Sequence, residues 1–143
     1  MQVPSERYLF GRVILADALQ GRAPMPGAHL LYIYDYQSSV MEPDDAELRP
    51  GKLLIPPVWT NSLAWKKGYF QTIENKEVGH FDLLQQHCFY MVPLSRSGTG
   101  KLFDETGLEL KHRSDPCGEW GLVSYRWIDD RVSDALGIQR VPE

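Results

Sequence analysis

The stretch RYLFGRVIL, residues 7–15, decides how the rest of the chain is interpreted. It is rich in aromatic and β-branched residues, which predicts a strand, and Gly11 within it predicts a bulge or a close backbone contact. The stretch HLLYIYDY, residues 29–36, resumes this pattern after a Pro- and Gly-rich turn at residues 20–27. We therefore expect the two stretches to form an antiparallel pair.

The same signals continue along the chain. Further strands are expected over residues 52–55, 68–76, 87–92 and 122–128, and a hairpin is expected over residues 102–112. A helix of one to two turns is expected from Arg131 to Leu136, with an Asp cap before it and Gly137 as its stop. Together these elements predict a mainly β (α+β) fold, built as a single small barrel-like or strongly bent antiparallel sheet with one or two short helices.

The length of 143 residues and mass of 16.4 kDa correspond to one ordinary domain, so we expect residues 1–143 to form a single domain. Alternate strand positions place a set of apolar side chains on one side of the proposed strands, and these should form the core. The expected core residues are Tyr8, Phe10, Val13, Leu31, Ile33 and Phe89.

Charge and cysteine content narrow the class of protein. The net charge of -4 argues against nucleic-acid binding, which needs clustered Lys and Arg, and favours a cationic partner. No apolar run approaches the roughly 20 residues needed to span a bilayer, and the first residues do not resemble a signal peptide. Two cysteines, Cys88 and Cys117, are too few for a disulfide framework, so a cytoplasmic location is expected; whether they meet in space is left open.

The motifs that suggest chemistry are weak. The stretch SRSGTGKL, residues 95–102, departs from a phosphate-binding loop at both ends, because Ser95 stands where Gly is needed and Leu102 where Ser or Thr is needed. The His and Cys residues lack the paired spacing of a zinc site. Cys117 could act as a nucleophile only if one of the four histidines lay beside it in the fold, and the sequence does not show such an adjacency. We predict no catalytic residue, no metal and no cofactor.

Two groups of residues are candidates for binding. An aromatic group that includes Trp59, Trp65 and Tyr69 fits a sugar or peptide platform, although such residues also fill small β cores. Four carboxylates crowd the loop at residues 42–47, which indicates either a solvated connection or a negative patch that steers a basic partner.

The order of several short segments resembles the immunity protein 26 family of bacterial polymorphic toxin systems. The segments are Tyr8–Ile14, His29–Asp35, Leu54–Pro57, Trp65–Phe70, Gly121–Tyr125 and Ile128–Asp130. Members of this family are β-rich single domains. The resemblance implies that the chain binds and neutralises a toxin, and it brings no catalytic residues.

The leading hypothesis is an immunity protein, or antitoxin, that is not an enzyme and that covers the C-terminal domain of a cognate toxin. A cationic nuclease is the expected toxin, bound by a monomer or in a one-to-one complex. The alternative is a small-molecule or glycan-binding β module that uses the aromatic platform, and a third reading is an enzyme that uses Cys117 or residues 95–101. The expected toxin-binding residues are Glu42, Asp44, Asp45, Glu47, Trp59, Trp65, Asp104 and Glu105.

Overall fold

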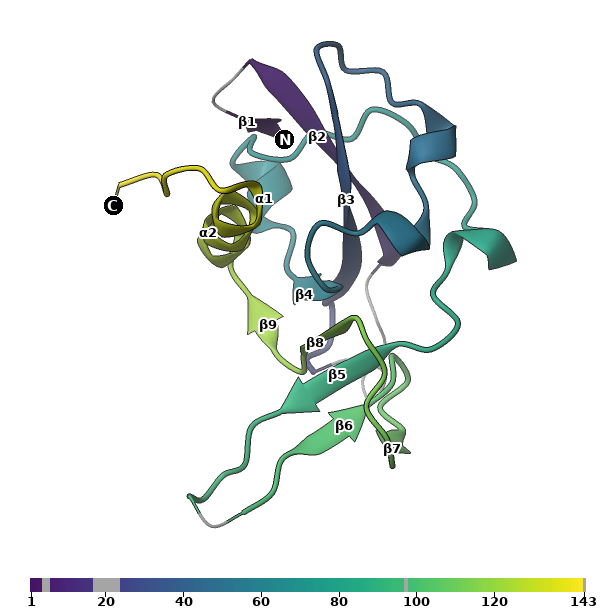
Figure 1. Cartoon of the computed structure of the whole chain (residues 1–143), viewed down its shortest axis with the longest axis vertical. Coiled ribbons are helices and arrows are strands. Elements are labelled where there is room, and N and C mark those ends of the chain that lie inside the picture. The colour runs from purple at the N-terminus through teal and green to yellow at the C-terminus, as the bar shows by residue number, and fades with distance from the viewer. Residues whose placement is uncertain (4–5, 17–23, 97, 143) are drawn as a thin grey trace.

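The structure, a computed structural model, describes residues 1–3, 6–16, 24–96 and 98–142. Its strands form two sheets, and helix α2 lies beside the first sheet (Figure 1). The first sheet has the order β1 (Gln2–Val3), β2 (Arg7–Leu15), β3 (His29–Ser38), β4 (Val58–Thr60) and β9 (Leu122–Val123). The second has the order β7 (Glu109–Leu110), β6 (Lys101–Phe103), β5 (Cys88–Met91) and β8 (Cys117–Glu119). The helices are α1 (Leu63–Lys66), α2 (Tyr125–Leu136) and the 3-10 helices η1 (Asp45–Glu47), η2 (Pro50–Lys52) and η3 (His80–Asp82).

The mainly β, α+β class predicted from the sequence is confirmed, but the strands are divided between two sheets. The strands of the described residues form two open sheets instead of one bent sheet, and they do not close into a barrel. Two strand pairs, β4 with β9 and β5 with β8, are parallel. A parallel pair needs a long connection between its strands, and in both pairs the two strands are far apart in the sequence.

The pair β2 and β3 forms as predicted. The observed β2 has the predicted bounds, and β3 extends two residues beyond Tyr36. The register shifts between Leu9 and Gly11, which is the expected bulge. A Cβ atom on Gly11 would lie 2.7 Å from the carbonyl oxygen of Tyr32, so the expected close backbone contact is present as well. The predicted turn at residues 20–27 lies partly outside the described residues.

Strand β3 is buried on both faces, which corrects the expectation of a one-sided core. On one face, Tyr32 packs in a cluster with Phe10 and with Phe89 of the second sheet. On the other face, Leu31 and Ile33 pack with Ile128 of helix α2 and its neighbours. The strand is central because one of its faces is covered by the second sheet and the other by a helix.

The predicted core residues divide into two groups. Four of them are buried, and the remaining two, Tyr8 and Val13, are only partly buried at the margins of the two clusters. Both lie on β2, which has the short edge strand β1 as its outer neighbour in the sheet, so fewer atoms cover them.

Helix α2 begins earlier than expected. Residues 122–128 were expected to be a strand, yet only Leu122 and Val123 are, because the Ser124 hydroxyl caps the helix by accepting a hydrogen bond from the Trp127 N–H at 3.1 Å. Ile128 and Val132, four residues apart, then turn one face of the helix towards β3. The predicted Asp cap is therefore wrong, whereas the stop at Gly137 is confirmed by its φ of 69°.

Two other predicted strands are absent. Residues 52–55 contain the end of η2 and a single bridge between Leu53 and Tyr34. Residues 68–76 turn at Gly68 and then run along the first sheet without joining it. The predicted strand at residues 87–92 and the hairpin at residues 102–112 are present as β5, β6 and β7.

Candidate functional site

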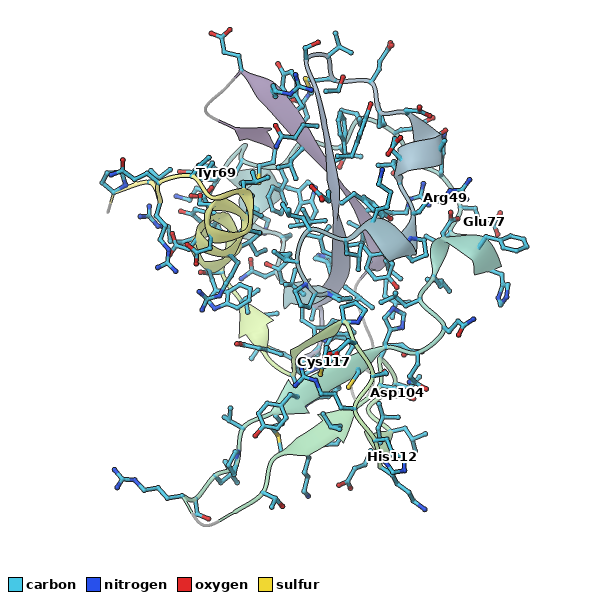
Figure 2. All side chains as sticks on the ribbon, viewed as in Figure 1. Arg49, Tyr69, Glu77, Asp104, His112 and Cys117 are labelled. Atoms are coloured by element: carbon cyan, nitrogen blue, oxygen red, sulfur yellow. The ribbon has the colours of Figure 1, made fainter. Side chains whose placement is uncertain are left out.

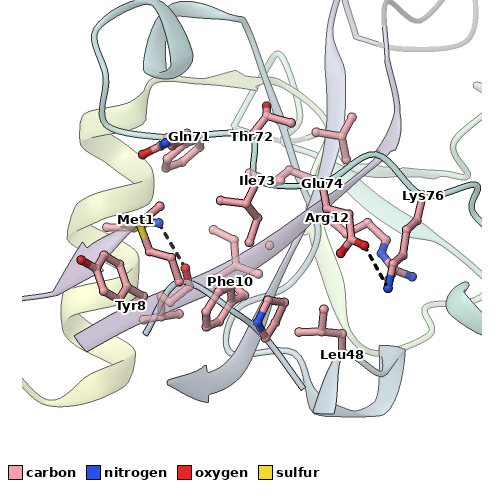
Figure 3. Close-up of a pocket in the computed structure, with 18 of the residues that line it drawn as sticks. Met1, Tyr8, Phe10, Arg12, Leu48, Gln71, Thr72, Ile73, Glu74 and Lys76 are labelled. Atoms are coloured by element: carbon pink, nitrogen blue, oxygen red, sulfur yellow. Dashed lines mark hydrogen bonds and ion pairs between the residues drawn. The ribbon is translucent and has the colours of Figure 1, made fainter. Parts of the chain in front are cut away.

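A groove of about 250 Å³ lies over β2, on the side where residues 70–76 pass along the first sheet. Figure 3 shows it between β2 and this segment, with Leu48 at one end. Its lining is mainly apolar and comes from β2, β3, the loop at residues 41–48 and the extended segment. The lining includes Tyr8, Phe10, Val13, Leu31, Ile33, Met41, Leu48, Trp65, Phe70 and Ile73.

Charged side chains form the rim of the groove. Lys76 forms an ion pair with Asp45 of η1 and lies 3.4 Å from a carboxylate oxygen of Glu74. The hydrogen bond to Asp45 is the largest cause that raises the pKa of Lys76. These contacts tie the loop at residues 41–48 to the extended segment, so the two sides of the groove hold each other in place.

The area around the groove is acidic. Residues 42–52 and 70–77 together carry six carboxylates against three cationic side chains. Figure 2 labels two of these charges, Arg49 and Glu77, which both lie toward the edge of the molecule in this view. The net charge of this area is therefore negative even after its internal ion pairs are formed.

The four acidic residues predicted in the loop, hereafter the acidic loop (Glu42–Glu47), are used in different ways. Asp44 caps η1 by accepting a hydrogen bond from the Ala46 N–H at 3.0 Å. Asp45 pairs with Lys76, and Glu47 pairs with Lys52. Glu42 is exposed and takes part in none of the ion pairs found among the described residues. Three of the four carboxylates thus already have partners within the chain.

The two predicted tryptophans lie in different environments. Trp65 lines the groove, half-buried, with its ring edge-on to Phe70 at 5.1 Å. Trp59 is 0% exposed and packs against Phe89 at 5.4 Å in the core, so a partner cannot touch it without unfolding. Tyr69 is exposed but stacks on Tyr125 of α2 instead of joining the tryptophans. The three aromatic residues therefore do not form one platform.

The two acidic residues predicted between β6 and β7 both have hydrogen-bond partners within the chain. Asp104 accepts hydrogen bonds from the backbone N–H groups of Thr106 and Leu108 at 2.8 and 3.0 Å and so closes the turn between β6 and β7. Glu105 accepts a hydrogen bond from Nδ1 of His87 at 3.0 Å. Asp104 lies with the second sheet, well away from Arg49 and Glu77 (Figure 2).

A buried hydrogen-bond array, hereafter the buried relay, joins the two sheets at His87. The sequence did not predict it, because its residues are far apart in the chain. The Tyr32 hydroxyl accepts the Leu84 N–H at 3.1 Å and donates to Nε2 of His87 at 2.5 Å, while Nδ1–H of His87 donates to Glu105. Burial lowers the pKa of His87 and raises that of Tyr32 to about 12. Because Tyr32 and His87 are buried, this array holds β3 against the second sheet, and only Glu105 at its end is partly exposed.

Among the described residues, the sequence motifs that suggest chemistry do not lie in a catalytic arrangement. Residues 95–102 lead into strand β6 and not into a helix N-terminus, which a phosphate loop requires. Cys117 faces Cys88 and not a histidine, and burial is the largest cause that raises its pKa to about 12, the reverse of an activated nucleophile. No group of three or more potential metal ligands is found among the described residues. Within the same residues, no helix is long and apolar enough to cross a membrane.

Comparison with known protein families gives a match. The model of a family described as Immunity protein 26 matches residues 1–90. This range contains every residue that lines the groove and ends at Tyr90 in β5; two segments of the resemblance noted above, residues 121–125 and 128–130, lie beyond it. Searches of curated proteins and of solved structures gave no match.

Proposed function

The chain belongs to the immunity protein 26 family, and on this basis we propose that it neutralises a cognate bacterial toxin by covering the toxin's C-terminal domain, without a reaction of its own. The family match over residues 1–90 is the observation that carries the proposal, because the family suggests toxin neutralisation in general. The buried relay at His87 and the raised pKa of Cys117 fit a protein without catalytic groups.

The acidic groove is the first proposed contact surface. Its apolar floor offers area to bury, and its rim carries more negative than positive charge, which suits a cationic partner. A nuclease fits this description, since an enzyme that holds phosphates has a basic cleft. The contact residues in this proposal are the four carboxylates of the acidic loop together with Trp65, and Trp59 is left out because it is buried.

A second proposed contact is the hairpin arm, defined as residues 90–96 and 98–101, which projects from the second sheet (Figure 1). Tyr90, Val92 and Leu94 alternate along it and are 37%, 67% and 100% exposed. The arm also carries Arg96 and Lys101 and no carboxylate, so it fits an apolar patch of the toxin flanked by acidic groups. Asp104 and Glu105 directly follow β6, the strand that begins at the end of this arm.

The remaining features of the proposal concern the state of the protein. Residues 1–143 act as one domain and as a monomer in a one-to-one complex in the cytoplasm, and they bind no nucleic acid. The net charge of -4 supports the last point. The alternative, a small-molecule site, is favoured by the apolar floor of the groove, and it would give binding without any toxin present.

The test uses the toxin domain encoded beside this chain and a charge-reversal variant, Glu42→Lys with Glu77→Lys. Both side chains are exposed and neither takes part in the ion pairs described above, so the variant should stay folded. We expect association at low salt to slow about tenfold and to recover at high salt, because long-range steering is screened. Stopped-flow or surface binding measures both rates.

The matched control is Glu109→Lys with Glu119→Lys, which makes the same change in net charge at two exposed positions on the second sheet. It should slow association less than the groove variant. Equal rates for the groove variant and the parent would show that the acidic groove is not a contact. Failure of the parent itself to bind the toxin or to protect cells would overturn the proposed function.

A further inference from the structure

The two cysteines, 29 positions apart in the chain, meet at the junction of β5 and β8. Cys88 and Cys117 are directly paired in the parallel register of these strands, and both are free thiols. Their Sγ atoms lie 3.1 Å apart. Neighbouring strands are about 4.8 Å apart, within the range of Cα separations that a disulfide bridges. The sulfur atoms need to approach by only about 1 Å to bond.

The two thiols differ in access. Cys88 is 1% exposed, whereas Cys117 is half-buried and lines a second cavity, of about 510 Å³, together with Pro57 and Trp127. A reagent from solution therefore reaches Cys117 first. Burial, followed by the contact with Cys88, raises the pKa of Cys117, so this thiol is a slow nucleophile on its own. The proximity of Cys88 favours the second step, in which the two sulfur atoms of the chain bond to each other.

We propose that Cys88 and Cys117 form an oxidation site, which a disulfide oxidant converts into an intramolecular disulfide. Deprotonated Cys117 attacks the oxidant, one thiolate leaves, and a mixed disulfide forms on Cys117. Deprotonated Cys88 then attacks Sγ of Cys117 and expels the second thiolate. The two cysteine thiols lose two electrons, the oxidant gains them, and the two protons end on the two released thiols.

The bond would tie β8 to β5 where the second sheet meets the first. Gly118, next to Cys117, packs so closely on the backbone of Pro57 that a Cβ atom would lie 2.2 Å from the Pro57 carbonyl oxygen. The bond would hold this contact and close the chain from Cys88 to Cys117 into a loop, which restricts the unfolded state. In a reducing cytosol the pair stays as two thiols, so its state reports the compartment in which the protein resides.

This inference goes beyond the proposed function and does not depend on it. Neither cysteine lines the acidic groove, so oxidation should leave binding at the groove unchanged. The effect is expected on stability alone.

The experiment treats the purified full chain with oxidised glutathione and measures the intact mass and the free thiols. We expect the folded parent to lose both free thiols, to become lighter by two hydrogen atoms, to carry no glutathione, and to melt several degrees higher until dithiothreitol reverses the change. The Cys88→Ser variant should retain one glutathione on Cys117. The Cys117→Ser variant should react little, because Cys88 is buried.

The result for the parent tests the proposed disulfide even if a variant folds poorly. A parent that keeps both thiols, that stops at a glutathione adduct, or that forms disulfide-linked dimers overturns the proposal. Oxidation in urea with none under native conditions would also overturn it, since the proximity of the sulfur atoms would then play no part.

Discussion

The acidic loop and the hairpin arm are both exposed, but their side chains have opposite relations to the rest of the chain. In the acidic loop, Asp44, Asp45 and Glu47 are engaged as a cap or as ion-pair partners. In the arm, Val92 and Leu94 point outward and leave most of their apolar surface in solvent. The loop lies within the part that the family model matches, and the arm follows that part except for Tyr90, the last residue matched.

The difference shows how exposed charge and exposed apolar surface should be weighed. A carboxylate that looks free in the sequence often has a partner in the fold, so reversing it changes local structure as well as the field that a toxin meets. An exposed row of apolar side chains at alternate positions serves no purpose in the folded chain alone, which makes it the sharper indication of a partner. The two surfaces therefore call for different tests: on-rates for the loop and off-rates for the arm.

The largest expected effect contrasts a buried side chain of β5 with an exposed side chain of the hairpin arm. Phe89 is 0% exposed and packs with Trp59 and Trp120, so Phe89→Ala should lower the free energy of unfolding by about 3–5 kcal/mol. Leu94→Ser, five positions later and 100% exposed, should change it by less than about 0.5 kcal/mol. Urea denaturation measures both. Similar losses for the two variants would mean that the arm is packed and not exposed.

The limits of the sequence are clear from the same region. The strand-like composition of residues 87–92 was enough to predict β5, and the turn at residues 105–107 was enough to predict the hairpin of β6 and β7, because these signals are local in the sequence. They could not say which face would remain uncovered, since that depends on whether another element packs there. The parallel strand β8 was missed for a related reason, because it is three residues long and pairs with β5 across a long connection.

The groove could not be predicted from the sequence either. The ion pair that closes its rim joins Asp45 to Lys76, which are 31 positions apart. The aromatic residues at 68–76 suggested a strand, yet Phe70 and Ile73 line the groove from a segment with no strand partner. The early start of α2 could have been read from Ser124 and the four-residue spacing of Ile128 and Val132.

The next largest effect is expected on toxin binding by the arm, and this prediction depends on the proposed function. Val92→Ser with Leu94→Ser should weaken binding of the toxin domain about 10- to 100-fold, mainly through faster dissociation, because the variant removes apolar area that is buried only in the complex. The matched control is Phe81→Ser, which removes an apolar side chain that is 83% exposed on η3, outside the arm. Unchanged dissociation in the arm variant would leave the acidic groove as the proposed contact.

The smallest expected effect lies at the base of the arm, where His87 precedes β5. Burial lowers the pKa of His87 below its ordinary value of 6.5, while the charge and hydrogen bond of Glu105 act in the opposite direction. The unfolded chain therefore takes up a proton more readily than the folded one, so stability is full above about pH 6.5 and falls as the pH drops below it.

Glu105→Gln removes the charge that offsets burial. The pKa of His87 should then fall further, and the free energy of unfolding should decrease more steeply in acid. The control is Glu109→Gln, the same change at an exposed carboxylate of β7, which should leave the pH dependence of stability as it is in the parent. Urea denaturation from neutral pH to about pH 5, together with an NMR titration of the His87 ring, measures both quantities. A parent whose stability rises in acid would instead have a charged His87 paired with Glu105. The proton between Tyr32 and His87 would then lie on Nε2, and the base of the arm would be held by an ion pair instead of by a neutral relay.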